Sequence, residues 1–423
     1  MLRLKSLVLI LGIAAVGESA LAQTSKLDSL AKEVALLKKQ TSALSNLKVS
    51  GYIQAQYQYA DTLGAKTFNG GNFANEVDNR ISVRRARIKF GYDMSFGSAV
   101  LLLDGTEKGI SVRNAYLNLT APFAQSLSLT GGIFERPFGY AIEYSSSSME
   151  VVERPMMFQT LFPGEQEVGA MLTYKADGQS ALKGLTIKGS FFNGNGIYAD
   201  VDKFKDFIGK ISYSGLSSSN VYINLGASLY SGRVYNPTTT VYKMDNASGI
   251  SAYTGTTDEV GASLKRQYVG FDAQLSVKTP IGKTQLVSEY IFGKQPGTSK
   301  SSKSPDYGAL PTTASFLREF AGSYVTLIQQ IHKFSVYGRY DWYDPNTKIK
   351  GNEVGLSATG LTATNATDLK LTTTSLGTFY EPNKNLRFTA QYDFNRYEKT
   401  SNGKFSAAGL NNNLFTLRIQ YKF

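Results

Sequence analysis

The sequence predicts an all-β fold, a 16-stranded antiparallel transmembrane β-barrel with a short N-terminal helical coiled-coil segment. Three observations lead to it. Apolar and polar residues alternate in repeated stretches of seven to thirteen residues, the pattern of strands that face lipid on one side and water on the other. Long and short connections alternate between these stretches. The chain also begins with the features of an export signal and ends on an aromatic residue.

Composition excludes several classes of function. The chain has no Cys and a single His, His332, so thiolate metal sites, disulfides and His-dependent catalysis are not expected. We therefore expect no enzyme activity, no metal and no cofactor. The net charge is +12, but the basic residues are dispersed along the chain, so nucleic acid is not an expected partner. Beyond the N-terminus there is no apolar run near the length of about 20 residues that a membrane helix needs.

The first 22 residues have the order of a secretory signal peptide. Arg3 and Lys5 precede an apolar stretch at 7–16, and Ala20-Leu21-Ala22 follows as a small-residue cleavage site. The mature chain would begin near Gln23.

Residues 23–46 carry a heptad pattern. Leu27, Leu30, Val34, Leu37, Thr41 and Leu44 recur at alternating spacings of three and four, as the a and d positions of a coiled coil do. The pattern predicts a periplasmic coiled coil that supports a trimer. A single amphipathic helix lying on the mouth of the barrel is an equally good interpretation.

The barrel domain is expected at 47–423. Its first stretch alternates between apolar Val49, Ile53 and Ala55 and polar Ser50 and Gln54. An even number of strands returns both termini to the periplasmic side, as single-chain bacterial barrels require. The 16 predicted strands are 47–59, 84–93, 98–104, 110–119, 126–134, 166–174, 184–192, 206–213, 220–230, 267–279, 283–293, 318–328, 334–343, 371–380, 386–396 and 413–423.

The connections support this count. Short turns contain Pro, Gly or Asn, as at Ala121-Pro122 and Pro280-Ile281-Gly282. The long connections, expected to be external loops, are 60–83, 135–165, 231–266, 294–317 and 344–370. The final strand places Phe415, Leu417, Ile419, Tyr421 and Phe423 on one face, and its terminal Phe resembles the signal by which outer-membrane barrels are recognised for assembly.

Several segments, in order along the chain, resemble the phosphate-selective porin O and P family. They are Arg84-Arg85-Ala86-Arg87-Ile88, Gly132-Ile133-Phe134-Glu135-Arg136-Pro137-Phe138-Gly139, Glu153-Arg154-Pro155, Phe192-Asn193-Gly194-Asn195-Gly196, Gly338-Arg339-Tyr340-Asp341-Trp342-Tyr343-Asp344-Pro345-Asn346 and Leu417-Arg418-Ile419-Gln420-Tyr421-Lys422-Phe423. The resemblance covers nearly all of the barrel. It implies a homotrimer in which the third external loop, here 135–165, folds inward and narrows the channel.

The period of two assigns a set of basic residues to the water-filled lumen. Fixed charge in a narrow channel concentrates the opposite ion, and the fork of arginine suits transient contact with an anion. Acidic residues share this face, so the surplus of positive charge is small and many of the bases could pair across strands instead. The candidate pore-lining bases are Arg85, Arg87, Lys89, Lys188, Lys210, Arg339, Arg387 and Arg418.

The predicted constriction loop is acidic. Its charged residues are Glu135, Arg136, Glu143, Glu150, Glu153, Arg154 and Glu165. Carboxylates at the narrowest point would repel phosphate, whereas carboxylates paired with the arginines of the 84–93 strand would anchor the loop. We favour the anchoring interpretation.

These features predict a bacterial outer-membrane porin, a passive diffusion channel for small hydrophilic solutes with a mild preference for anions, including phosphate. Its expected partners are membrane lipid, small anionic or polar solutes and two further copies of the chain. One alternative is a channel for oligosaccharides, with sugar rings stacking on Tyr52, Phe134, Tyr222, Tyr230 and Tyr337. The other is a surface barrel without a conducting pore, which meets its partners through the loops at 231–266, 294–317 and 344–370.

Overall fold

The structure is a computed structural model. It describes residues 29–37, 45–180, 182–245, 249–254, 257–355, 365–400 and 412–423. The predicted signal peptide at 1–22 lies outside the described residues. No helix in the described part of the chain is long and apolar enough to cross a membrane.

Sixteen strands form a closed antiparallel barrel, because the first strand of the sheet also pairs with the last. Each strand pairs with its neighbour in sequence, except that β9 pairs with β12 across a hairpin made by two further strands. The barrel strands are β1 (Leu47–Ala60), β2 (Asn79–Met94), β3 (Gly97–Thr106), β4 (Gly109–Ala121), β5 (Ala124–Glu135), β6 (Gln166–Lys175), β7 (Leu185–Phe192), β8 (Asp206–Ser218), β9 (Val221–Tyr235), β12 (Ser263–Thr279), β13 (Gly282–Gly297), β14 (Ser315–Ile331), β15 (Phe334–Asp344), β16 (Leu371–Tyr380), β17 (Leu386–Tyr397) and β18 (Asn413–Lys422).

Each of the sixteen predicted strands overlaps one of these barrel strands, so the predicted barrel and its strand number are confirmed. Most observed strands are longer than predicted, because ladder pairing continues past the last residue that alternates clearly. Strand β2, for example, begins at Asn79, five residues before the predicted start at 84.

The alternation along the strands sorts side chains between the two faces of the wall. Across the seam between β1 and β18, Ile53 faces Tyr421 and both side chains are exposed on the outside. The next pair, Gln54 and Gln420, is buried inside, and the two amides are joined by a 2.6 Å hydrogen bond. A wall with exposed apolar residues outside and buried polar residues inside is the arrangement of a membrane barrel.

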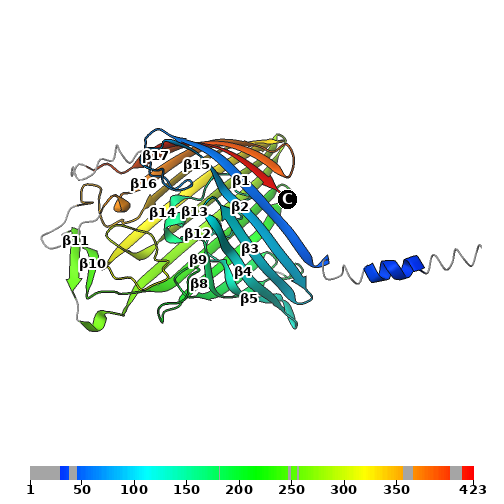
Figure 1. Ribbon diagram of the computed structural model, residues 1–423, viewed down its shortest axis with the longest axis horizontal. Helices are drawn as coiled ribbons and strands as arrows, with labels where there is room; N and C mark the ends of the chain where they lie inside the picture. The colour runs from blue at the N-terminus through cyan, green and yellow to red at the C-terminus, as the bar shows by residue number, and fades with distance from the viewer. Residues whose placement is uncertain are drawn as a thin grey trace, which may run out of the picture.

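The two ends of the barrel differ. Strand β1 begins at the end where the chain terminates, and hairpin β10–β11 lies at the opposite end (Figure 1). Long connections lie at the hairpin end, at 61–78, 136–165, 193–205, 236–262, 298–314, 345–370 and 398–412. The connection between β3 and β4 departs from the predicted alternation, since it covers only 107–108 at the long-loop end.

Strands β10 (Thr240–Asp245) and β11 (Gly249–Thr254) form a hairpin inside the segment predicted as a plain loop at 231–266. Strand β10 also runs parallel to the start of β14. These strands have six residues each, which is too short for a period of two to stand out in the sequence. The other short elements are helix α2 (Met156–Leu161) and the 3₁₀ turns η1 (Thr257–Glu259) and η2 (Ala366–Asp368).

Residues 29–37 of the predicted coiled coil form a helix with exposed side chains. Residues 23–28 and 38–44 of the same prediction lie outside the described residues.

Candidate functional site: the loop inside the barrel

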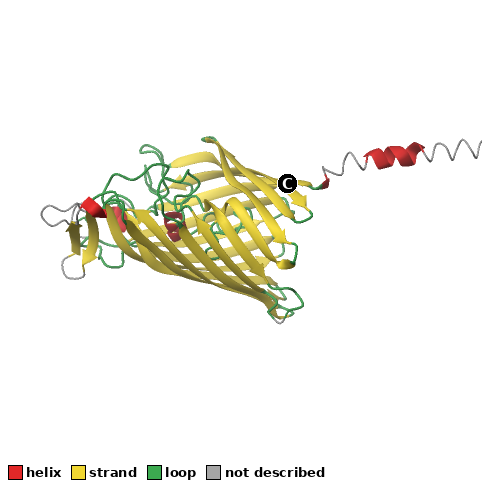
Figure 2. Cartoon of the chain, turned by 90° about the horizontal axis from the view of Figure 1, so that it is seen from below, coloured by secondary structure: helices red, strands yellow, loops and turns green. Residues whose placement is uncertain are grey.

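The connection between β5 and β6, residues 136–165, runs through the interior of the barrel. Its short helix α2 lies inside the ring of strands in both views (Figures 1 and 2). The contacts agree with this placement, because the loop bonds to inward side chains on opposite sides of the wall. It contacts Glu289 on β13, Ser228 on β9 and Arg387 on β17.

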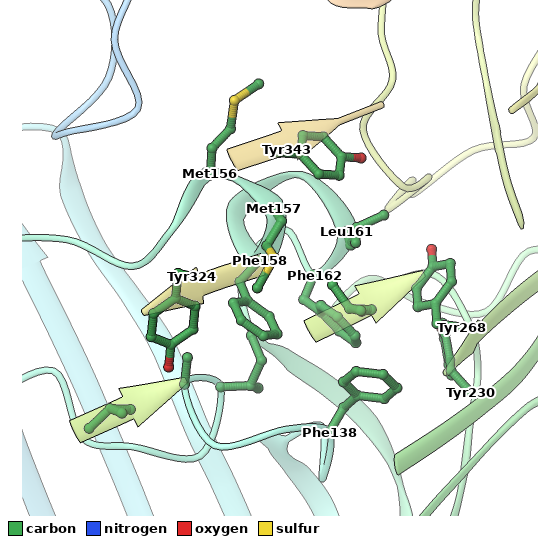
Figure 3. Packing of buried hydrophobic residues seen from close by; sticks show 14 of the residues in the cluster. Phe138, Met156, Met157, Phe158, Leu161, Phe162, Tyr230, Tyr268, Tyr324 and Tyr343 are labelled. Carbon is green, nitrogen blue, oxygen red and sulfur yellow. The ribbon is translucent and has the colours of Figure 1, made fainter. Parts of the chain in front are cut away.

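An aromatic cluster holds the helix of the loop against one side of the wall. Figure 3 shows Phe158 and Phe162 of the loop among tyrosines that come from the strands. The ring centroids of Phe162 and Tyr268 are 5.7 Å apart, and those of Phe138 and Phe162 are 4.9 Å apart. All of these rings are buried, so this contact excludes water from that side of the lumen.

Gly270 on β12 makes room for the cluster. A Cβ atom at this position would lie 2.6 Å from the ring of Phe138. The loop therefore approaches the wall at a point where the wall has no side chain.

Glu153 is the central ion-pair residue of the loop. It is 2% exposed, and its carboxylate accepts hydrogen bonds from Arg84 at 2.7 Å, Arg85 at 2.8 Å and Arg418 at 2.8 Å. The first two arginines come from β2 and the third from β18, so one carboxylate joins the loop to both sides of strand β1.

Four inward bases donate to backbone carbonyls of the loop. Arg339 donates to Glu153 and Arg418 to Val152, each at 2.6 Å. The other two donors follow the same pattern: Arg387 donates to Met149 at 2.7 Å, and Lys210 to Gly139 at 2.5 Å. Bases predicted to line the pore thus fasten the loop to the wall.

The remaining predicted bases divide between the loop and the open lumen. Lys188 and Lys210 both pair with Glu143 of the loop. Arg87 donates to Asp104 at 2.9 Å and to the Ser146 hydroxyl at 2.9 Å. Lys89, two positions further along β2, is exposed.

Wall carboxylates also fasten the loop. Glu289 accepts from the backbone N–H groups of Tyr140 at 2.7 Å and Ala141 at 2.8 Å. Gly139 sits beside this carboxylate with a positive φ of 60°, and a Cβ atom there would lie 2.2 Å from a carboxylate oxygen. The loop therefore needs glycine at this position.

The other charged loop residues bond within the loop or at its ends. Arg154 donates to Glu165 at 2.8 Å and to the carbonyl of Ala141 at 2.6 Å. Arg136 donates to the carbonyl of Pro163 at 2.7 Å. Glu150 accepts from the hydroxyl of Tyr144 at 3.0 Å.

Glu135 belongs to the wall and not to the loop, which is a correction to the predicted loop boundary at 135. It is the last residue of β5, and its carboxylate accepts from Asn114 at 2.8 Å. The predicted pairing of loop acids with β2 arginines holds for Glu153. By contrast, Glu143 pairs with lysines of β7 and β8, and Glu165 with Arg154 and a β4 arginine.

The carboxyls of the loop have shifted pKa values, and Glu153 and Glu150 differ in the direction of the shift. Burial alone would raise the pKa of Glu153, but the charges of Arg84, Arg85 and Arg418 hold this pKa well below the ordinary value of 4.5. Burial raises the pKa of Glu150, which has a tyrosine hydroxyl as its hydrogen-bond partner. The loop is therefore fastened by Glu153 in its charged form.

A water-accessible cavity of about 480 Å³ lies between the loop and strands β2 to β4. Arg84 and Arg113 are its more exposed arginines, with side chains 27% and 19% accessible, whereas Arg85 is 3% accessible. Asp104 and Glu165 are the acidic side chains of the lining. The basic side chains of the lining are Arg84, Arg85, Arg87, Arg113, Arg154 and Lys303.

The sequence alternation does not identify Arg84 and Arg113 as lumen residues. The register of β1 with β2 skips Arg84, and the register of β3 with β4 skips Arg113. Each arginine is thus the extra residue of a β-bulge, where two consecutive side chains turn to the same face. The bulge puts Arg84 beside Arg85 on one carboxylate. The sequence does contain one signal of these bulges: at each of them a basic residue interrupts the alternation of apolar and polar residues.

The predicted sugar-stacking track is mostly inaccessible. Tyr52, Phe134, Tyr230 and Tyr337 are at most 7% exposed. Tyr222 is 42% exposed. The four buried rings fill space between the wall and the loop, so a sugar cannot stack on them in this arrangement.

The described residues contain no group of three or more His, Cys, Asp or Glu side chains placed to hold a metal ion.

Comparisons with known proteins extend this description. No protein-family model matches the sequence, and no curated protein matches it. Solved structures do. OprB of Pseudomonas putida has a TM-score of 0.56 and 10% identity over 91% of this chain and 96% of that chain. The outer membrane channel DcaP of Acinetobacter baumannii has a TM-score of 0.52 and 13% identity over 89% of this chain and 97% of that chain.

An anion-selective porin from Comamonas acidovorans has a TM-score of 0.52 and 11% identity over 89% of this chain and 99% of that chain. The chain has the porin fold. At this level of identity the likeness concerns the fold, and the resemblance to the phosphate-selective O and P family stays a prediction.

Proposed function

We propose that the protein is a bacterial outer-membrane porin, a passive diffusion channel for small hydrophilic solutes with a preference for anions. The observation that carries the anion preference is the cavity beside the loop, which is lined by six basic and two acidic side chains. Fixed positive charge beside a narrow passage raises the local concentration of anions. The anion-selective porin among the solved structures of this fold agrees with the proposal.

The outward face of the wall supports the membrane location. Large apolar side chains are exposed on the outward face, where water would disfavour them and lipid would not. The outward face includes Phe271, Leu275, Leu286, Tyr290, Val325 and Leu327.

A measurement of reversal potential in a planar bilayer tests the proposal. In a KCl gradient the wild-type channel should give a potential of the sign set by chloride. The double variant Arg84→Gln/Arg113→Gln removes the two most accessible guanidinium groups of the lining and should shift the potential toward zero. Arg396→Gln is the control, because Arg396 is exposed near the end of β17, outside the cavity lining. A cation-selective wild type would overturn the anion preference, and a barrel that inserts without conducting would overturn the channel.

Phosphate is the finer part of the proposal. Arginine binds two oxygens of an oxyanion at once, so the cavity favours phosphate over chloride at equal charge. Blockade of chloride current by millimolar phosphate, weaker in the double variant, is the expected result. Equal chloride current with and without phosphate would restrict the proposal to anions in general.

We further propose that the functional unit is a homotrimer held in part by the N-terminal segment. The helix at 29–37 exposes Leu30, Val34 and Leu37 at predicted a and d positions, and such residues are stabilised when helices pair. Mass measurement of the detergent-solubilised protein should give three chains. The variant Leu30→Asn/Leu37→Asn should lower the temperature at which they separate.

A further inference from the structure

The first long connection of the barrel, predicted as an external loop at 60–83, turns into the mouth of the lumen. In the structure it comprises residues 61–78. Gln58 of β1 donates to the backbone carbonyl of Asn69 at 2.8 Å, and the side-chain amide of Asn69 donates to the carboxylate of Asp393 on β17. Gln58 and Asp393 are both fully buried. The tip of loop 61–78 therefore crosses the inner side of β18, which lies between these two strands.

Arg80, the second residue of β2, holds this tip in place. Its guanidinium donates to three backbone carbonyls of the tip, those of Gly71 at 2.9 Å, Asn72 at 3.1 Å and Asn69 at 3.4 Å. It also donates twice to the side-chain oxygen of Gln58, at 2.8 Å and 2.9 Å. A planar fork with five N–H donors can bind several carbonyls at once, which the ammonium of lysine cannot match. Arg80 thus fixes three peptide groups of the loop beside β1.

Loop 61–78 also packs against loop 136–165. Phe68 contacts the aromatic cluster that holds helix α2. The space between residues 66–69 and the side chains of Arg154 and Met156 is only about 20 Å³, room for about one water molecule. Inward residues of β15, β16 and β17 bound the same space. The two loops together therefore leave no room for a solute beside these three strands.

On its other side, loop 61–78 bounds the basic cavity beside β2 to β4. The residues that it contributes to the lining are uncharged: Thr67, Phe68, Gly70, Gly71 and Asn72. The bases of the lining come from β2, β4, loop 136–165 and the connection at 298–314. Fixed charge determines which ions a narrow passage concentrates. An uncharged part of the lining limits the space that a solute can occupy.

We propose that loop 61–78 sets the size limit of the channel and that Arg80 is its positioning residue. This inference rests on the proposed channel and adds a second, uncharged constriction to loop 136–165. Size and charge are then selected by different parts of the molecule, because the arginines of β2 and β4 act on ions and the loop excludes bulk. Shortening the loop should therefore change the largest solute that passes more than it changes the ion preference.

Replacement of residues 66–72 by Asn-Gly tests the loop. The N–H of Phe73 already donates to the carbonyl of Ala65 at 2.9 Å, which is the hydrogen bond that closes a two-residue turn. In proteoliposomes this short-loop variant should admit larger neutral sugars than wild type admits, and its single-channel conductance should be higher. Its reversal potential in a KCl gradient should move less than that of Arg84→Gln/Arg113→Gln.

Substitution of Arg80 tests its role as the positioning residue. Arg80→Gln should raise the size limit as the short-loop variant does, because the tip loses its guanidinium. Arg80→Lys keeps the charge but lacks the fork, so it should behave like Arg80→Gln. In the short-loop variant Arg80→Gln should have no further effect on the size limit, since the carbonyls that Arg80 holds are absent. Lys66→Gln is the control, because Lys66 is an exposed base of the same loop outside the cavity lining.

Two outcomes would overturn the inference while the channel stands. An unchanged size limit in both the short-loop variant and Arg80→Gln would show that loop 61–78 does not limit the passage. An equal effect of Arg80→Gln with the full and the short loop would show that Arg80 does not act through the loop. Arg80→Gln keeps the length of the loop, so it decides the question even where the short-loop barrel fails to assemble. A wild type that never conducts would contradict the proposed channel, and this inference with it.

Discussion

At the scale of residues, the direction of each side chain determines which groups face the lumen and which of these contact the loop. The alternation of the sequence places Arg85 and Arg87 inside correctly, since a strand with regular pairing turns every second residue to the same face. It fails at Arg84 and Arg113, because a bulge depends on the register of two strands that lie far apart in sequence. The sequence also could not show that most inward bases would contact the loop. Those contacts depend on the path of the loop in three dimensions.

Replacing Glu153 with Gln should release the loop. The change leaves Arg85 and Arg418 buried without their carboxylate, and an uncompensated buried charge costs about 3–5 kcal/mol. We expect faster cleavage of residues 136–165 by protease and a larger channel conductance. Glu107→Gln, at an exposed acid in the β3–β4 connection, is the control. Unchanged cleavage in Glu153→Gln would show that the other contacts of the loop hold it without this ion pair.

Mild acid should leave the loop in place. Despite burial, neighbouring arginines lower the pKa of both Glu153 and Glu165 below 4.5. A carboxyl with a lowered pKa stabilises the docked loop above its ordinary pKa, and that contribution is lost as the pH falls through the lowered value. Loop cleavage should therefore not increase between pH 7 and pH 5 and should increase only below about pH 4.5. An increase between pH 7 and pH 5 would contradict this assignment.

At the scale of elements, the length of a strand or helix determines whether it can be predicted from the sequence. Barrel strands of eight to seventeen residues repeat the alternation often enough to be recognised. Strands β10 and β11 and helix α2 have six residues each, and tertiary contacts determine such short elements more than their own sequence does. Helix α2 is held by the rings around it, which come from strands distant in the sequence.

Gly270→Ala should loosen the same loop from the other side. The added methyl group would overlap the ring of Phe138, and overpacking of this kind costs about 1–3 kcal/mol. We expect a lower unfolding temperature and more variable conductance. Gly131→Ala is the matched control, because a Cβ atom there meets nothing within 4 Å. Equal effects of the two substitutions would mean that the loop is not packed against β12.

At the scale of the whole molecule, closure of the barrel depends on the seam between β1 and β18. The backbone of Gly51 exchanges two hydrogen bonds of 3.0 Å with that of Phe423. The sequence predicts this closure only indirectly, through an even strand number and terminal strands that both alternate. The register of the seam depends on the closed ring and cannot be predicted from the sequence of either strand alone.

A disulfide can test the seam because the chain has no Cys. Ile53 and Tyr421 are directly opposed, and opposed residues have Cα atoms about 4.5–5.5 Å apart, within the range a disulfide spans. The variant Ile53→Cys/Tyr421→Cys should form an intramolecular disulfide under mild oxidation, detected by peptide mass. Ile53→Cys/Leu327→Cys, which pairs β1 with β14, should not. The reverse outcome would contradict the closed ring.

The pairing of the first strand with the last also constrains biogenesis. Every shorter nascent chain lacks a neighbour for one edge of β1, and an unpaired edge invites association with other chains. Bringing together ends separated by most of the polypeptide carries an entropic cost that local hairpins do not share. The ring can therefore be completed only after β18 has been synthesised. Until then the β1 edge needs protection during passage to the membrane, by a holding factor or by the lipid itself.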